Sequence, residues 1–185
     1  MAKLIYFTPT SLDGFIADGA GDLDWSAPDE QVMAFINELM RPIGTYLYGR
    51  KTYETMAVWQ TPEVIPDLTP HMREFAPIWQ AAGKVVYSRS LEAVPTPNTR
   101  LEREFDFQPV QDLKARSPHD VTVGGPELAA QAIRAGLVDE YHLLVVPAML
   151  GRGRRVFPDN ARIELELLDE RRVGKGWIYL RYRNL

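Results

Sequence analysis

The 185-residue chain contains no cysteine. This absence excludes disulfides, iron–sulfur clusters, thiolate zinc sites and a cysteine nucleophile. Histidine is nearly as scarce: the chain has only His71, His119 and His142, and no two of them have the spacing of a helical metal site. We therefore expect no metal centre in this protein.

Long apolar runs and an excess of positive charge are also missing. No apolar run reaches the roughly 18 residues of a membrane helix, and Met1-Ala2-Lys3 leads directly into a strand-like run rather than a signal peptide. The formal net charge of −4 argues against a nucleic-acid surface. Hydrophobic residues make up 45% and charged residues 25%, which are the proportions of an ordinary folded domain. We expect one cytoplasmic domain over residues 1–185, with a small molecule as its partner rather than nucleic acid or a membrane.

Short apolar runs alternate with helix-like segments along most of the chain. Such runs are typical of parallel strands that helices cover on both faces. Near the C-terminus two strand-like segments flank Gly174-Lys175-Gly176, as in an antiparallel hairpin. The pattern predicts an α/β fold with a mostly parallel central sheet and an antiparallel C-terminal hairpin. The expected strands are Leu4–Phe7, Thr45–Tyr48, Lys84–Ser88, Leu101–Phe105, Val121–Val123, Tyr141–Val146, Ile163–Leu168 and Trp177–Tyr182.

Three further expectations concern helix ends and strand neighbours. Ser26 and Asp29 have the spacing of a capping box at the start of the first helix. Pro77 should kink or split a later helix, because proline has no N–H and its ring clashes with the preceding turn. The strands at 121–123 and 141–146 are joined by one helix and should form a parallel pair.

Glycine lies at two expected strand-to-helix junctions, in Gly49-Arg50-Lys51-Thr52 and in Gly124-Gly125-Pro126. A glycine lets the backbone approach a ligand closely, and a helix start offers free N–H groups, so each junction can hold an anion such as phosphate. Neither matches a dinucleotide fingerprint or a P-loop, and either could serve only a tight turn. Two such junctions in one small sheet favour a dinucleotide that lies beyond the carboxyl ends of the strands.

Basic residues offer a further anion site. Ser88-Arg89-Ser90 follows directly after a third expected strand, and a guanidinium between two hydroxyls is a good receptor for a phosphomonoester such as the 2′-phosphate of NADP. The alternative is an arginine in a solvated loop, and Arg50 and Lys51 could equally be surface charges. The run Arg152–Arg155 is expected to be a solvated turn, with phosphate contact as the less favoured alternative.

The acidic candidates for a catalytic role are Asp13, Asp29 and Glu30. Asp13 precedes Gly14 and could be only a turn residue, while Asp29 and Glu30 are favoured by the dipole at a helix start. Asp29 and Glu30 also follow a glycine-rich loop, where a carboxylate could orient a heterocycle or relay a proton. Trp25 precedes them and could stack on a flat ring of the substrate or simply pack against the core.

Six short motifs then resemble, in their order, the dihydrofolate-reductase-like superfamily. The match is closest to the C-terminal reductase domain of the bacterial bifunctional deaminase–reductase of riboflavin synthesis and its stand-alone relatives. It spans nearly the whole chain, and the six motifs together are specific. They are Ser11–Ala17, Tyr48–Glu54, Ser88–Ser90, Gly124–Leu128, Gly136–Glu140 and Pro147–Gly151.

The resemblance implies a three-layer dihydrofolate-reductase-like fold and NADPH as the hydride donor. It places the 2′-phosphate at Ser88–Ser90 and the other phosphates at the two glycine junctions, and it makes Ala17 part of a mobile loop over the nicotinamide. It also places Asp29 or Glu30 near the carboxylate that binds the pterin in dihydrofolate reductase. The residues it assigns to the cofactor are Ala17, Gly49, Arg50, Lys51, Thr52, Ser88, Arg89, Ser90, Gly124, Gly125, Pro126 and Glu127.

The expected activity is NADPH-dependent reduction of a small nitrogen heterocycle, and the family implies the riboflavin-pathway pyrimidine 5-amino-6-(5-phosphoribosylamino)uracil. Dihydrofolate or another pterin is the alternative substrate, and an NADP-binding protein without turnover is the alternative of another class. One residue departs from the family pattern, since riboflavin reductases often carry an acidic residue where this chain has Val123. The resemblance further implies a homodimer.

Overall fold

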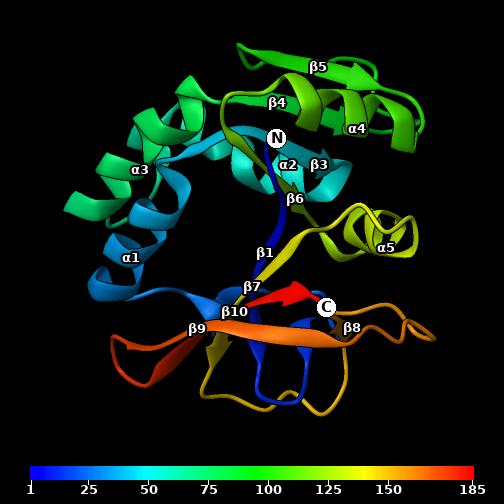
Figure 1. The fold of residues 1–185 in the computed structure, drawn as a ribbon. Coiled ribbons are helices and arrows are strands. Elements are labelled where there is room, and N and C mark those ends of the chain that lie inside the picture. Colours follow the sequence, from blue (N-terminus) through cyan, green and yellow to red (C-terminus); the bar gives the residue numbers. More distant parts are fainter.

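The computed structural model describes all 185 residues and shows a central sheet between layers of helices (Figure 1). The helices are α1 (Glu30–Met40), α2 (Arg50–Met56), α3 (Pro70–Ala81), α4 (Phe107–Arg116) and α5 (Pro126–Arg134), and short 3₁₀ turns are η1 (Asp24–Ser26), η2 (Ala57–Gln60) and η3 (Pro62–Val64). The strands are β1 (Leu4–Ser11), β2 (Phe15–Ala17), β3 (Ile43–Gly49), β4 (Gly83–Tyr87), β5 (Thr99–Glu102), β6 (Asp120–Gly124), β7 (Glu140–Val146), β8 (Arg154–Arg155), β9 (Leu165–Val173) and β10 (Trp177–Asn184). The α-helices lack the length and hydrophobicity that a membrane-spanning helix requires.

Eight strands form the main sheet in the order β5-β4-β3-β6-β1-β7-β10-β9. The strands from β5 to β7 pair in parallel, whereas β10 runs antiparallel to both β7 and β9. The turn between β9 and β10 is made by Gly174 and Gly176, whose φ angles of 51° and 99° favour glycine. The mostly parallel sheet and the antiparallel C-terminal hairpin are therefore confirmed.

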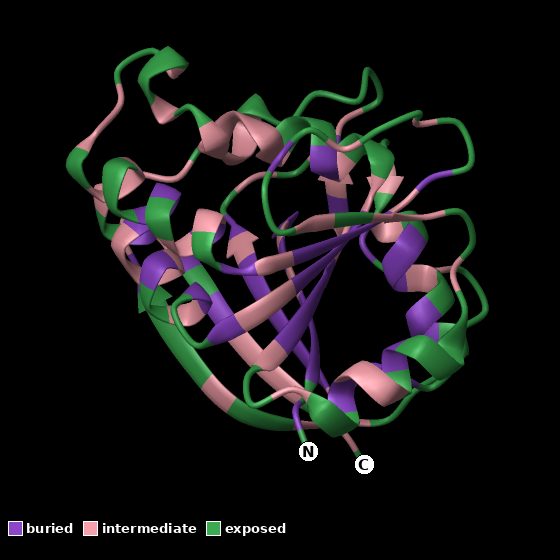
Figure 2. Cartoon of the chain, turned by 90° about the horizontal axis from the view of Figure 1, so that it is seen from above, coloured by how far each residue is buried: buried purple, intermediate pink, exposed green.

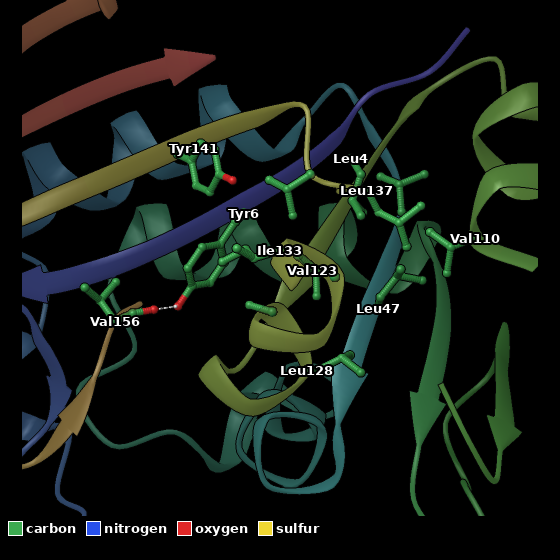
Figure 3. Packing of buried hydrophobic residues seen from close by; sticks show 14 of the residues in the cluster. Leu4, Tyr6, Leu47, Val110, Val123, Leu128, Ile133, Leu137, Tyr141 and Val156 are labelled. Carbon is green, nitrogen blue, oxygen red and sulfur yellow. Dashed lines mark hydrogen bonds between the residues drawn. The ribbon is translucent and has the colours of Figure 1, made fainter. Parts of the chain in front are cut away.

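Both faces of the sheet are buried, which explains its nearly continuous apolar strands. In β1, Leu4 and Tyr6 face one core with α4 and α5, while Ile5 faces another with α1 and α3. Figure 2 shows the buried strands lying between the helices, and Figure 3 shows Tyr6 and Leu4 packed among residues of α5 and neighbouring strands. This arrangement confirms the three-layer fold.

The first helix begins later than the capping box predicted. Asp29 is its N-cap and accepts a hydrogen bond from the Val32 backbone N–H at 2.9 Å. Ser26 lies in η1, where its hydroxyl donates to the Leu23 carbonyl at 2.8 Å. The prediction of Ser26 as N-cap was wrong because its hydroxyl is engaged by the preceding turn, which leaves the cap to Asp29.

Two other expectations also need correction. Helix α3 continues through Pro77 and is not split, although the proline leaves the carbonyl of Arg73 without its usual helical donor. Strands β6 and β7 are parallel but not neighbours, because β1 lies between them and pairs with both. The connection through α5 therefore crosses over β1.

Two buried tyrosines give a test of the core. The Tyr6 hydroxyl donates to the Val156 carbonyl at 2.8 Å, the dashed line in Figure 3, whereas the buried Tyr46 hydroxyl has no partner. Tyr6→Phe should lower the free energy of unfolding by about 1 kcal/mol, because a net hydrogen bond is lost. Tyr46→Phe is the matched control and should leave that free energy unchanged or raise it, since an unpaired buried hydroxyl is destabilising. Urea denaturation of both variants measures the difference, and equal losses would contradict the assignment.

Candidate functional site

Three strand ends that carry candidate residues lie next to one another. Strands β4, β3 and β6 are consecutive in the sheet and parallel, so their carboxyl ends open onto the same edge. Ser88–Ser90 follows β4. Arg50–Thr52 follows β3, which ends at Gly49, and Gly125–Pro126 follows β6, which ends at Gly124. The fold thus brings together three segments that are far apart in the sequence.

Arg50 connects two of these segments. Its Nε donates to the Glu54 carboxylate at 2.7 Å, one helical turn further along α2, and its Nη1 donates to the Ser90 hydroxyl at 3.1 Å. The guanidinium therefore spans from the start of α2 to the loop after β4. Lys51 and Arg89 are exposed on the same two segments. The edge consequently presents three cationic side chains, a suitable arrangement for phosphate.

The glycine pair after β6 is required by close packing. A Cβ on Gly124 would lie 3.0 Å from the Tyr48 ring, and one on Gly125 would lie 2.5 Å from the Thr52 hydroxyl. Gly125 also has a φ of 88° and is the N-cap of α5, which Pro126 opens as its first residue. The two glycines have no side chains that could cover the backbone of this turn. The N–H groups at the start of α5 have no helical partners.

The side chains of Ser88 and Val123 are buried, so each contributes to the fold. The buried Ser88 hydroxyl accepts the Leu91 N–H at 3.0 Å, so it shapes the turn that exposes Arg89 and Ser90. Val123 is 1% exposed and packs in the core with α5. The side chain at position 123 therefore lies inside the protein. Val123, where riboflavin reductases often carry an acidic residue, is a core packing residue in this chain.

Asp13 lies beyond the carboxyl end of β1. Its carboxylate accepts from the Ser11 hydroxyl at 2.6 Å, from the Leu150 N–H at 3.1 Å and from the Gly151 N–H at 2.7 Å. The hydrogen bond from Ser11, then those from the backbone of Gly151 and Leu150, lower the pKa of Asp13 to about 2. A carboxylate with that pKa has no proton to give at neutral pH, which argues against a role as general acid.

The other two acidic candidates contact helices and turns rather than the three strand ends. Asp29 caps α1 and also accepts the Lys175 N–H at 3.4 Å. Glu30 lies 2.7 Å from His71 Nδ1 on α3, and hydrogen bonds from Thr69 and His71 lower its pKa. Both carboxylates thus help to hold α1 to its neighbours.

Ala17, which the resemblance assigned to a mobile loop, is the last residue of β2. Ala17 is 6% exposed and pairs with Arg154 in the two-stranded β2–β8 sheet, so the run Arg152–Arg155 is not simply a solvated turn. Trp25 is half-buried in η1, where its Nε1 donates to the Asp22 carbonyl at 3.2 Å. Arg154 forms an ion pair with Glu127 at 3.1 Å, which the sequence analysis did not predict. The alternation of glycine and arginine in the run Arg152–Arg155 was the only signal for it.

A cavity of about 320 Å³ lies at the opposite edge of the sheet, against α1 and at the amino ends of β1, β3, β6 and β7. Glu140 lines it and is 4% exposed. Burial alone would raise its pKa, but hydrogen bonds from Arg181, Lys3 and His142 outweigh burial and lower the pKa to about 2. Hydrogen bonds join Glu140 to His142 and Arg181, and His142 to Tyr179, within the cavity lining. The cavity contains none of the candidate residues.

Three comparisons place this chain among known proteins. A family model described as the RibD C-terminal domain matches residues 2–179. The uncharacterized protein YyaP of Bacillus subtilis is 29% identical over 184 residues, which cover 97% of this chain and 94% of that protein. The structure of a Shewanella sp. PV-4 protein named for riboflavin biosynthesis has a TM-score of 0.76 at 22% identity, covering 100% of this chain and 99% of the other. A Thermotoga maritima diaminohydroxyphosphoribosylaminopyrimidine deaminase/5-amino-6-(5-phosphoribosylamino)uracil reductase has a TM-score of 0.67 at 18% identity, covering 100% of this chain and 57% of that longer one. The two structural likenesses show that the fold is shared.

The Glu140 cluster predicts how stability depends on pH. Because the pKa of Glu140 is about 2 in the folded protein, against an ordinary value of 4.5, its ionised form stabilises the fold above pH 4.5. This contribution should be lost as the pH falls from about 5 to about 2. In Glu140→Gln, denaturation curves should show lower stability at neutral pH and a weaker decline over this range. Glu164→Gln, at an exposed position, is the control, and an identical decline in Glu140→Gln and wild type would contradict the assignment.

Proposed function

Because the chain belongs to the RibD C-terminal domain family, we propose that it is an NADPH-dependent reductase of a small nitrogen heterocycle. One structural neighbour is named for riboflavin biosynthesis and another for 5-amino-6-(5-phosphoribosylamino)uracil reduction, which supports an oxidoreductase. The observation that carries the proposal is the meeting of Arg50, Arg89 and the Gly124–Gly125 turn at one edge of the sheet.

The residues at this edge fit the coenzyme. Arg89 and Ser90, with Arg50 beside them, would hold the 2′-phosphate, while Lys51 and the side-chain-free turn at Gly125 would hold the pyrophosphate. With the 2′-phosphate at β4 and the pyrophosphate between β3 and β6, the nicotinamide end would point toward β1 and Ala17. When bound, NADPH supplies the hydride, for an electrophilic C=N or imine carbon of the substrate. The other residues that we propose to line the coenzyme at this edge are Gly49, Thr52, Ser88, Gly124, Pro126 and Glu127.

The chain's own task is alignment and exclusion of water, since the coenzyme carries the hydride. Water would supply the proton, because Asp13 has a pKa of about 2 and the pKa of Glu30 is also lowered. Asp29 and Glu30, at the start of α1, would orient the heterocycle through their carboxylates, and Trp25 would pack beside it. We propose the riboflavin-pathway pyrimidine as substrate, because the Thermotoga relative is named for its reduction.

Loss of NADPH absorbance with candidate substrates tests the function. Steady oxidation with 5-amino-6-(5-phosphoribosylamino)uracil supports the proposal, and preference for dihydrofolate would replace the pyrimidine by a pterin. Saturable NADPH binding without turnover would make the protein a binder. Calorimetry without any heat of NADPH binding would overturn all three.

Arg89→Ala tests whether Arg89 binds the 2′-phosphate of NADPH. Loss of a charged hydrogen-bond partner should weaken NADPH binding by about tenfold to a hundredfold and leave NADH binding unchanged, because only NADPH carries that phosphate. Calorimetry with both coenzymes measures the ratio. Arg73→Ala, an exposed arginine on α3, is the control and should bind both as wild type does. Equal losses for NADPH and NADH would show that Arg89 does not contact the 2′-phosphate.

We also propose a homodimer that forms through β9. This nine-residue strand is an edge of the main sheet and exposes Leu167 and Leu168. An edge strand with unpaired backbone groups and exposed leucines is a ready surface for pairing. Light scattering should give a particle of twice 21.0 kDa, and a particle of 21.0 kDa at every concentration would contradict the proposal.

A further inference from the structure

We propose that Asp13 is a positioning residue, whose carboxylate holds the segment Pro147–Phe157 across the carboxyl ends of β1 and β7. This inference rests on the proposed function, because it concerns the end of the site where the reacting ring would lie. The segment follows β7 and contains β8. Figure 1 shows it beside the turn between β1 and β2, at the lower end of the molecule.

The segment is attached to the β1–β2 turn at several points. The Asp13 carboxylate accepts the Leu150 and Gly151 N–H groups, and the Leu12 N–H donates to the Ala148 carbonyl at 2.8 Å. Further along, the Val156 N–H donates to the Gly14 carbonyl at 3.0 Å. Asp13 is the side chain of the β1–β2 turn that joins these backbone bonds, and from β1 the Tyr6 hydroxyl also donates to the segment, at the Val156 carbonyl.

The same segment packs against the loop that begins at Ala17. A Cβ on Gly153 would collide with the Ala17 carbonyl oxygen, so the two backbones approach more closely than any side chain at 153 would allow. The Arg152 side chain lies against Gly19. Movement of this loop over a nicotinamide ring would therefore involve the segment that Asp13 holds.

The far end of the segment reaches the start of α5. Arg154 lies 3.1 Å from Glu127, in the first turn after the Gly125 turn. The segment thus runs from β1 to the turn that would hold the pyrophosphate. It borders the space beyond β6 and β1, where the nicotinamide end is expected.

The charge of Asp13 suits positioning rather than proton transfer. An ionised carboxylate accepts hydrogen bonds from three donors, and its pKa of about 2 keeps it ionised throughout the neutral range. An asparagine would keep one acceptor oxygen but would place an NH₂ group against a backbone N–H. We therefore expect Asp13→Asn to loosen the segment and Asp13→Ala to loosen it further.

The test compares Asp13→Asn and Asp13→Ala with wild type and with Asp106→Asn. Asp106 caps α4 through the Gln108 N–H, so the control loses a similar carboxylate far from the segment. In the free protein, amide hydrogen exchange at Leu150 and Gly151 should accelerate about tenfold to a hundredfold, the effect of one charged hydrogen bond. The Kd for NADPH should stay within about twofold, because the phosphate contacts lie elsewhere, while kcat should fall about tenfold or more in Asp13→Ala and less in Asp13→Asn.

The possible results distinguish the role of Asp13 from the proposed NADPH-dependent activity. Faster exchange and lower kcat at unchanged Kd and melting temperature support the role of Asp13. Unchanged kcat overturns that role whatever the exchange rates, and so does an equal loss of kcat in the Asp106 control. Asp13→Asn keeps the side-chain volume and carries the test if Asp13→Ala does not fold. If wild type itself fails to bind NADPH, the proposed function is overturned, and the role of Asp13 in it is overturned too.

Discussion

The loops of the candidate site lie together because β4, β3, β6 and β1 pair in parallel. Parallel strands have their carboxyl ends at one edge, so every loop that follows them opens there. Ser88–Ser90, Arg50 and the Gly124–Gly125 turn gather because of this pairing, although they come from distant parts of the sequence. A cavity of about 320 Å³ lies at the other edge, where the Arg181 guanidinium donates hydrogen bonds to the Glu140 carboxylate.

The charged side chains divide into two groups by what they contact. Asp13 accepts hydrogen bonds from the Ser11 hydroxyl and from backbone N–H groups, and Asp29 accepts them from backbone N–H groups. Glu30 contacts His71, so all three carboxylates hold segments together. Lys51 and Arg89 are exposed at the sheet edge where β3, β4 and β6 end. The carboxylates therefore join parts of the fold, whereas these two cationic side chains face solvent.

The close approaches of backbone follow the same logic. At Gly125 and at Gly153 a side chain would collide with Thr52 and with the Ala17 carbonyl, respectively. Both glycines therefore let two segments pack at a distance that no other residue permits. The first approach shapes the turn at α5, and the second ties the loop after β2 to the segment after β7.

The sequence predicted the strand-like runs, the helices between them, the C-terminal hairpin and the glycine junctions, because periodicity and turn residues are local properties. It did not determine that β1 separates β6 from β7, that Asp29 rather than Ser26 caps α1, or that Asp13 bonds Gly151 across 138 positions of the chain. These features depend on which distant segments pack together, and that choice rests on burial and hydrogen bonding summed over the whole molecule. Long-range packing therefore brings the Leu150 and Gly151 N–H groups to the Asp13 carboxylate, and it leaves Arg89 exposed.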